Sequence, residues 1–196
     1  MPVRTHLLAV VLGAATVTAS YATFAAAPAS AATTFDVASI PLAPAPPAFP
    51  FVDWPAFVPA DQRTAWRTAA FDALPVIAGT ALVTLEGRLE ERRIAIPEGR
   101  SPHELRRYYR DRIGAMGGVQ VNRLQPVSDG AVVVDAVAKL FPADANPATQ
   151  LALCGYDEGR YQYEVYAIRS ESAQAWVVVQ TSTWTVCVTS IAVEPE

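Results

Sequence analysis

A proline-dense stretch toward the N-terminal side sets the strongest limit on what this chain can fold into. Seven of the nineteen residues at positions 41–59 are proline. Proline holds φ near −65° and has no backbone N–H to donate, so the stretch forms neither a helix nor a central strand. We predict an extended Pro-rich arm over residues 32–60, which leads into a single folded domain over residues 61–196.

Aromatic side chains interrupt the prolines of this arm at Phe49, Phe51, Trp54 and Phe57. A disordered linker is poorer in aromatic residues, so we expect this part of the arm to lie against protein. Two arrangements remain open. Trp54 closes the edge of the core of its own domain, or Trp54 and Phe51 meet a partner, which a polyproline conformation allows at low entropic cost. The burial of Trp54 distinguishes them.

Residues 1–31 have the pattern of a secretory signal peptide. Arg4 and His6 precede an apolar run over residues 7–19, and Ala29, Ser30 and Ala31 form a small-residue cleavage site. The thirteen residues of this run are fewer than the roughly 20 that span a bilayer, so we expect cleavage and no transmembrane anchor. The first cysteine, Cys154, is too distant for a bacterial lipid anchor. We expect an exported protein, either periplasmic or extracellular.

Export would carry Cys154 and Cys187 into an oxidising compartment, where two cysteines more often pair than remain free. Both lie in segments that alternate like strands. We therefore predict a structural disulfide that joins the first of the C-terminal strands to the last. A redox or metal site is the weaker alternative, because the chain has no CxxC motif and His103 is its only histidine beyond the signal. We expect no cofactor and no metal.

One helix has a clear start signal. Ser101, Pro102 and Glu104 form a capping box in which the serine hydroxyl accepts from an amide of the first turn and Glu104 reaches back. Apolar residues follow at helical spacing until Gly117 and Gly118. Residues 61–73 fit a shorter helix. The segment 130–141 is ambiguous between strand and helix, and we favour a helix.

Strand-like segments make up most of the remaining domain. They lie at residues 81–86, 89–96, 119–124, 151–154, 161–169, 175–181 and 184–193, separated by turn-forming residues. We predict an α+β fold: a mainly antiparallel sheet of five to seven strands with two helices packed on one face.

Three segments together resemble a known family. They are Leu85-Glu86-Gly87-Arg88, then residues 96–102 (IPEGRSP), then a helix that carries Leu105 and the pair Tyr108-Tyr109. This order is similar to the domain of unknown function that precedes the peptidoglycan-binding module in some OmpA-family envelope proteins of bacteria. The likeness covers roughly residues 49–195. It implies an α+β domain of the cell envelope, and it carries no motif for peptidoglycan binding.

Composition and motifs exclude several functions. The net charge is −4 and Lys139 is the only lysine, so we expect no nucleic-acid partner. The sequence lacks HExxH, GxSxG and GxxxxGK[ST]. His103 lies inside the capping box, where it is expected to be a solvated residue of the first turn. A Ser-His-Asp site is therefore not expected.

Two groups of residues could contact a ligand. Arginine-containing clusters at residues 90–93 and 106–107 are typical of solvated surfaces, or of sites that grip an anionic lipid or glycan headgroup. Aromatic residues are frequent in the C-terminal strands: Tyr161, Tyr163, Tyr166, Trp176 and Trp184. They either pack as half-buried side chains, the reading we favour, or form a platform on which sugars stack.

These observations predict an exported, non-catalytic cell-envelope protein that acts by binding an envelope component, a glycan or a protein partner. The alternative is a glycan hydrolase that uses carboxylates among Glu86, Glu90, Glu91 and Glu164. Such an enzyme needs two carboxyl groups within about 10 Å of each other. The sequence leaves the oligomeric state open.

Overall fold

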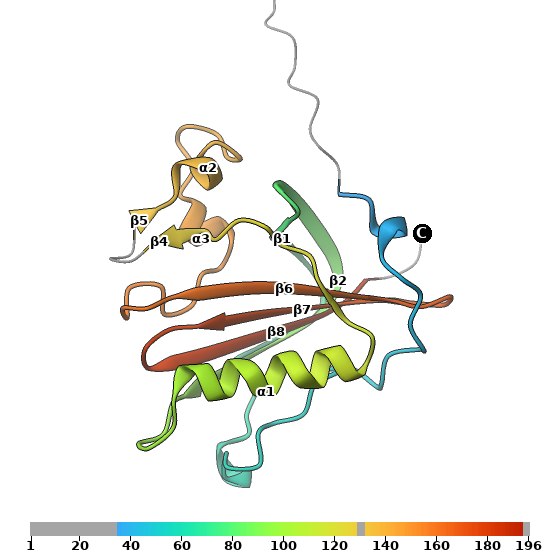
Figure 1. Ribbon diagram of the computed structural model, residues 1–196, viewed down its shortest axis with the longest axis vertical. Coiled ribbons are helices and arrows are strands. Elements are labelled where there is room, and N and C mark those ends of the chain that lie inside the picture. Colours follow the sequence, from blue (N-terminus) through green and yellow to red (C-terminus); the bar gives the residue numbers. More distant parts are fainter. Residues whose placement is uncertain (1–34, 129–131, 194–196) are drawn as a thin grey trace, which may run out of the picture. The chain divides into compact units, whose positions relative to one another are not determined.

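The computed structural model describes residues 35–128 and 132–193, so the predicted signal peptide lies outside the described part. Its centre is an antiparallel sheet of six strands in the order β1-β2-β8-β7-β6-β3 (Figure 1). These strands are β1 (Arg67–Ala78), β2 (Ala81–Ala95), β3 (Val119–Gln120), β6 (Gln162–Arg169), β7 (Gln174–Thr181) and β8 (Thr185–Val193). The predicted α+β class and antiparallel sheet are confirmed.

The three C-terminal strands form a meander that is buried on both faces. In β7, the side chains of Ala175, Val177 and Val179 enter one apolar core, and those of Trp176 and Val178 enter the other. Valine is favoured in such strands because its branched side chain packs well on a pleated surface. The strands β6, β7 and β8 agree with the predicted strands to within one residue at each end. Their ends could be predicted because valine runs mark the strands and turn-forming residues separate them.

The β1–β2 hairpin corrects two predictions. Residues 67–78, of which 67–73 were expected to be helical, form β1, because they pair with β2 from Arg67 opposite Glu91 to Ala78 opposite Ala81. The strands expected at 81–86 and 89–96 are one strand, β2. Gly87 does not interrupt it. A Cβ atom there would lie 2.0 Å from the carbonyl oxygen of Ala192, so this glycine allows β8 to approach closely.

The predicted long helix, α1 (Pro102–Ala115), covers one face of the sheet (Figure 1). Leu105, Tyr109 and Ile113 recur on its buried side. The Ser101 hydroxyl accepts from the amide of Glu104 at 3.1 Å, as expected of an N-cap. The Glu104 carboxylate, however, pairs with Arg100 and does not reach back. The carboxylate thus takes an exposed ion pair with the residue before the N-cap in place of the capping-box bond.

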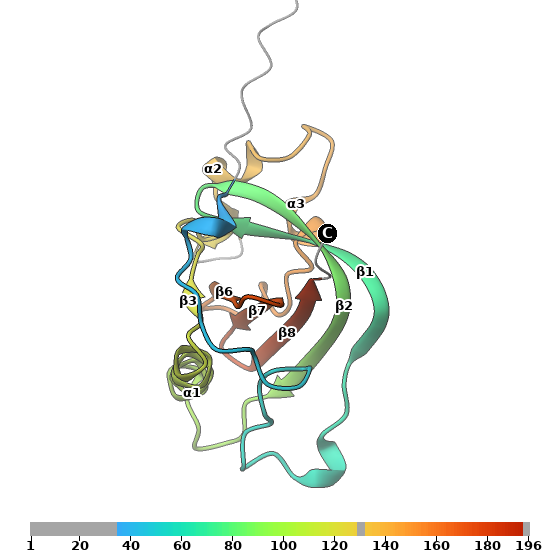
Figure 2. The same ribbon diagram turned by 90° about the vertical axis from the view of Figure 1, so that its right-hand side faces the viewer.

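The Pro-rich arm docks on its own domain. Residues 35–62 include two 3₁₀ turns, η1 (Val37–Ser39) and η2 (Ala60–Gln62), and run from the side of β3 to the start of β1 (Figure 2). Val52 and Val58 are buried in the core beneath α1, and Trp54 packs against that core half-buried. Ile40 enters the opposite core. The arm is therefore part of the folded unit, and residue 60 marks no structural boundary.

Chain with little regular secondary structure covers the face of the six-stranded sheet opposite α1. It carries α2 (Asp135–Ala138), α3 (Pro147–Gln150) and a separate hairpin of β4 (Val127–Ser128) and β5 (Val132–Val133) (Figure 1). Of the helix predicted at 130–141 only α2 forms, and residues 129–131 lie outside the described part. The helices are thus divided between two faces, with α1 on one and two four-residue helices on the other.

On this face of the sheet, side-chain amides take the place of backbone hydrogen bonds along part of the edge of β6. β3 has two residues, although a strand was expected over 119–124. Beyond it, Asn122 accepts from the Val165 amide at 2.9 Å and donates to the Tyr163 carbonyl at 2.9 Å. Gln125 likewise accepts from the Tyr163 amide at 2.9 Å. Two side chains therefore satisfy the edge of β6 where a backbone ladder was expected.

Candidate functional site

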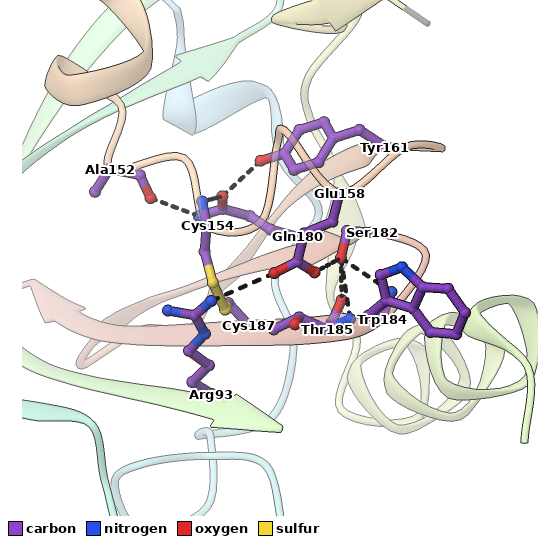
Figure 3. Close-up of a disulfide and its surroundings, with 10 residues drawn as sticks. All are labelled: Arg93, Ala152, Cys154, Glu158, Tyr161, Gln180, Ser182, Trp184, Thr185 and Cys187. Atoms are coloured by element: carbon purple, nitrogen blue, oxygen red, sulfur yellow. Dashed lines mark hydrogen bonds and ion pairs between the residues drawn. A yellow bond between two sulfur atoms is a disulfide. The ribbon is translucent and has the colours of Figure 1, made fainter. Parts of the chain in front are cut away.

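The predicted disulfide is present and fixes the loop that precedes β6. Cys154 and Cys187 are bonded, with their Cα atoms 6.2 Å apart (Figure 3). One detail of the prediction was wrong: Cys187 lies in β8, but Cys154 lies in a loop after α3. The preceding Ala152 has φ +48°, a left-handed conformation that a strand does not contain. The disulfide therefore joins a loop to the sheet.

Gln180 adds a second anchor to the same loop. Its side chain, which is buried, accepts from the Cys154 amide at 2.7 Å and from the Tyr161 hydroxyl at 2.6 Å. It also donates to the Ala152 carbonyl at 3.2 Å. Sequence analysis missed this residue, because a glutamine inside a valine-rich strand gives no sign of the loop it will meet.

The anchored loop in turn holds the turn between β7 and β8. The Ser182 hydroxyl donates to Glu158 at 2.7 Å and accepts from the Thr185 amide at 3.0 Å (Figure 3). The Ser182 hydrogen bond lowers the pKa of Glu158, and the Arg93 guanidinium contributes in the same direction. The Arg160 amide donates to the Thr183 hydroxyl at 3.1 Å. Loop and turn therefore form one connected unit.

A cleft of about 660 Å³ lies between this unit and the N-terminal end of α1. From the α1 side, it is lined by Arg100, His103 and Arg106. The sheet contributes Gln162 and Thr181, which are paired across β6 and β7. The loop and the turn contribute Arg160, Thr183 and Trp184. The cleft thus collects residues from three separate segments of the chain, 100–106, 160–162 and 181–184, so no local sequence motif could reveal it.

The cleft is rich in guanidinium groups. Arg100 pairs with Glu104, and the Arg106 Nε lies 3.7 Å from Glu164, beyond hydrogen-bonding distance. Arg160 forms no ion pair with any residue in the described part of the chain. His103 is exposed, as expected, with its Nδ1 3.3 Å from Arg106. At least one positive charge is therefore left for a ligand.

One buried hydroxyl in the cleft lacks a partner. Thr181 is 3% exposed, and its Oγ1 forms no hydrogen bond among the described residues. It lies at the end of β7 on the same face as Val177 and Val179, which is the face that α1 covers. Burying a hydroxyl without a hydrogen bond costs about 1–3 kcal/mol, so the group is available to a polar ligand atom.

The aromatic residues suggested for ligand contact are placed differently from a sugar platform. Tyr161, Tyr163 and Trp176 are 5%, 0% and 1% exposed, so they pack in the core, as in the interpretation we favoured, and are too buried to form the platform that was the alternative. Phe51 and Trp54 are half-buried on the arm, and the guanidinium of Arg92 lies 4.8 Å from the Trp54 ring centre. Trp184 differs from all of these, because it is 68% exposed at the rim of the cleft.

The four carboxylates of the hydrolase alternative do not gather at one cleft. Glu86 and Glu90 lie four residues apart on β2, about 13 Å at the rise of a strand. Glu91 projects from the opposite face of β2, and burial raises its pKa against the lowering effect of Arg67 and Arg93. Glu164 lies three strands away from β2, about 14 Å. Its carboxylate accepts from the Tyr166 hydroxyl at 2.9 Å.

Comparison with protein-family models, curated proteins and solved structures finds no match to this chain, so the site is interpreted from its own residues. Within the described ranges, no three residues of the types His, Cys, Asp and Glu come together in a way that could hold a metal ion. Over residues 35–128 and 132–193, every helix is too short or too polar to cross a bilayer.

Proposed function

We propose that this chain is an exported, non-catalytic protein of the bacterial cell envelope that binds an envelope component in the cleft at the N-terminal end of α1. The cleft itself carries the proposal. It brings Arg100, Arg106 and Arg160 together with an exposed indole in about 660 Å³, a volume within the range of small-molecule sites.

Two other observations support export and the envelope. The Cys154–Cys187 disulfide is of the kind that persists in oxidising compartments. The resemblance of residues 49–195 to the OmpA-associated domain adds the bacterial envelope as the location. The order of its motifs, a strand followed by a turn and a capped helix, agrees with β2 and α1.

The placement of the carboxylates supports binding over hydrolysis. A glycosidase of either stereochemistry holds its two carboxyl groups roughly 5 to 10 Å apart across one cleft. Of the four proposed residues, only Glu164 lies beside this cleft, through its contact with Arg106, and it is buried under that arginine. The cleft offers positive charge and a stacking surface, which are properties of a binding site.

Co-sedimentation tests the proposal. The full chain is expressed in a bacterium, purified from the exported fraction and mixed with isolated envelope from the source bacterium. We expect the wild-type protein to sediment with the envelope, and Arg160→Gln and Trp184→Ala to reduce the sedimented fraction at least fivefold. Trp66→Ala is the matched control, because Trp66 is 65% exposed but lies at the start of β1, outside the cleft.

Two results would overturn the proposal. One is a wild-type protein that stays in the supernatant at every protein concentration tested. The other is sedimentation that Arg160→Gln, Trp184→Ala and Trp66→Ala leave equally unchanged, which would place envelope binding elsewhere on the molecule. Release of reducing sugar from the envelope by the wild-type protein would favour the hydrolase instead.

A further inference from the structure

We propose that the cleft is a site for an acidic sugar. A carboxylate or phosphate group of the sugar lies between Arg106, Arg160 and the first turn of α1, and an apolar face of the ring stacks on Trp184. This inference rests on the proposed function in one respect, namely that the cleft is the ligand site. It adds the chemical class of the ligand.

The anion-binding part combines two arginines with a helix end. The Arg160 guanidinium has no ion-pair partner in the described part of the chain, and the buried Nε of Arg106 has no hydrogen-bond acceptor there. Arginine presents its N–H donors in a planar fork that matches a carboxylate or a phosphate. The 14-residue helix α1 adds the partial positive charge of its N-terminus on the same side of the cleft.

The Thr181 hydroxyl is an independent sign of a polar ligand. It is buried and unpartnered at the floor of the cleft, where Gln162 lies opposite it across the two strands. A valine there would fill the same volume without the cost of an unmade hydrogen bond. A sugar hydroxyl or ring substituent would supply the missing partner.

Trp184 supplies the stacking surface. Its exposed indole stands on a turn that Ser182 holds through Glu158 and the Thr185 amide, and in Figure 3 the ring projects away from the disulfide. Ordering an aromatic side chain on a fixed turn costs little on binding. Indole faces are apolar and electron-rich, so they suit the C–H face of a sugar ring.

Other anions fit less well. The remaining exposed large hydrophobic residues in the described part lie on other elements, at Leu42, Trp66, Phe71, Val119 and Val132. Trp184 is therefore an isolated aromatic and not part of an apolar belt that enters a membrane. Carboxylates also lie next to two of the three arginines of the cleft, Glu104 at Arg100 and Glu164 at Arg106. Such a cleft suits a ligand with one acidic group rather than a polyanion.

Isothermal titration calorimetry with matched sugar pairs tests the proposal on the full exported protein. The pairs are galacturonate against galactose and glucose 6-phosphate against glucose, with inorganic phosphate, AMP and phosphatidylglycerol vesicles as further probes. We expect at least one acidic sugar to bind ten times more tightly than its neutral counterpart. We also expect the indole N–H signal of Trp184 to shift in NMR spectra on titration, and that of Trp66 to stay in place.

Three variants separate the parts of the site. Arg160→Gln should weaken binding of the acidic sugar at least tenfold, whereas Arg107→Gln, on the exposed side of α1 and outside the cleft, should not change it. Trp184→Ala should weaken it about fivefold, with Trp66→Ala unchanged. Thr181→Val should weaken it two- to fivefold while the unfolding temperature stays the same or rises, a combination that damage to the fold would not produce.

Several outcomes would overturn the acidic-sugar proposal: equal affinity within both sugar pairs, no binding of any sugar, or tighter binding of inorganic phosphate, AMP or vesicles than of the acidic sugars. If any of these occurs while envelope sedimentation still depends on Arg160 and Trp184, the ligand class is wrong and the proposed function stands. If acidic sugars bind but the envelope does not, the proposed function fails and the ligand class stands.

Discussion

The two covers of the sheet are held in place by different means. On the α1 face, a long helix packs through apolar side chains, Leu105, Tyr109 and Ile113. The arm beside it adds Val52 to this core, and two of its carbonyls accept from Arg92 and Ser190. On the opposite face, irregular chain also buries apolar residues, but Asn122, Gln125 and Gln180 bind it to the sheet by hydrogen bonds, and a disulfide closes it.

This difference shows what holds a segment in place when it has few residues in helices or strands. A 14-residue helix satisfies its own backbone and needs only an apolar stripe. Chain without regular structure needs a partner for each buried amide and carbonyl, so buried side-chain amides gather there. The cleft lies where the two covers meet, with Arg106 from the first and Arg160 from the second.

The largest expected effect comes from a change in the second cover, the irregular chain on the face opposite α1. Replacing both cysteines, Cys154→Ala with Cys187→Ala, should lower the free energy of unfolding by roughly 3.5–4 kcal/mol, because the unfolded chain regains the freedom of the closed loop. Urea denaturation of the wild-type and variant proteins measures the loss. Amides that exchange only through global unfolding should accelerate in both covers by this lost stability, and residues 151–161 should accelerate further through local opening of the freed loop. Equal acceleration in both covers would show that they are not independent.

The second prediction breaks the arm in the first cover. Val52→Ala removes two buried methyl-sized groups and should lower the free energy of unfolding by about 1.5–2 kcal/mol. Asp53→Ala, at the exposed neighbouring position, is the control and should lie within about 0.5 kcal/mol of wild type. The variant keeps the backbone carbonyl of residue 52, which accepts from Arg92 at 2.6 Å, so only the packing of the side chain changes. A loss of more than about 3 kcal/mol in the free energy of unfolding would show that lost packing is not the cause.

The third prediction concerns the start of α1. Ser101→Ala removes the side-chain acceptor of the Glu104 amide, which keeps only its bond to the Ser101 carbonyl at 3.1 Å, and should cost about 1 kcal/mol in thermal or urea unfolding. Ser101→Asp restores an acceptor and should restore the stability, while its negative charge in the cleft should weaken binding of an acidic sugar. A Ser101→Asp protein that is as unstable as Ser101→Ala would argue against the cap.

The smallest effect is a pH dependence in the second cover. Because the folded state lowers the pKa of Glu158, the ionised carboxylate stabilises the fold above about pH 4.5, and this contribution is lost as the pH falls through the lowered value. Glu158→Gln should be less stable than wild type by about 0.5 kcal/mol at pH 7, and the difference should be smaller at pH 3. Urea titrations at both pH values provide the comparison, and a gap that widens on acidification would reverse the assigned sign.

The regular parts of the molecule could be predicted, since their signals are local. The N-cap at Ser101 with apolar residues at helical spacing predicted α1, and valine runs between turns predicted β6, β7 and β8. The strand β1 could not be predicted, because Ala65, Trp66, Ala69 and Ala70 have helical spacing and only pairing with β2 decides their conformation.

Most of the candidate site could not be predicted from the sequence. The disulfide followed from the presence of two cysteines in a chain that was predicted to be exported. The cleft did not, because Arg106, Arg160 and Trp184 come from segments that only the fold brings together. Trp54 was expected to anchor the arm, but the fully buried residues there are Val52 and Val58, which carry no sequence signal of their own.

The route of the arm also bears on when this protein can fold. The Ile40 carbonyl accepts from Arg169, 129 positions later, and the Pro50 carbonyl accepts from Ser190, 140 positions later. A chain that crosses a membrane from its N-terminus delivers the arm first and its docking strands last. Such distant contacts slow folding, and they cannot form before the final strands arrive. We expect a chain shortened before β8 to leave the arm open to protease. If the chain is exported as we propose, the arm docks only after the final strands have crossed.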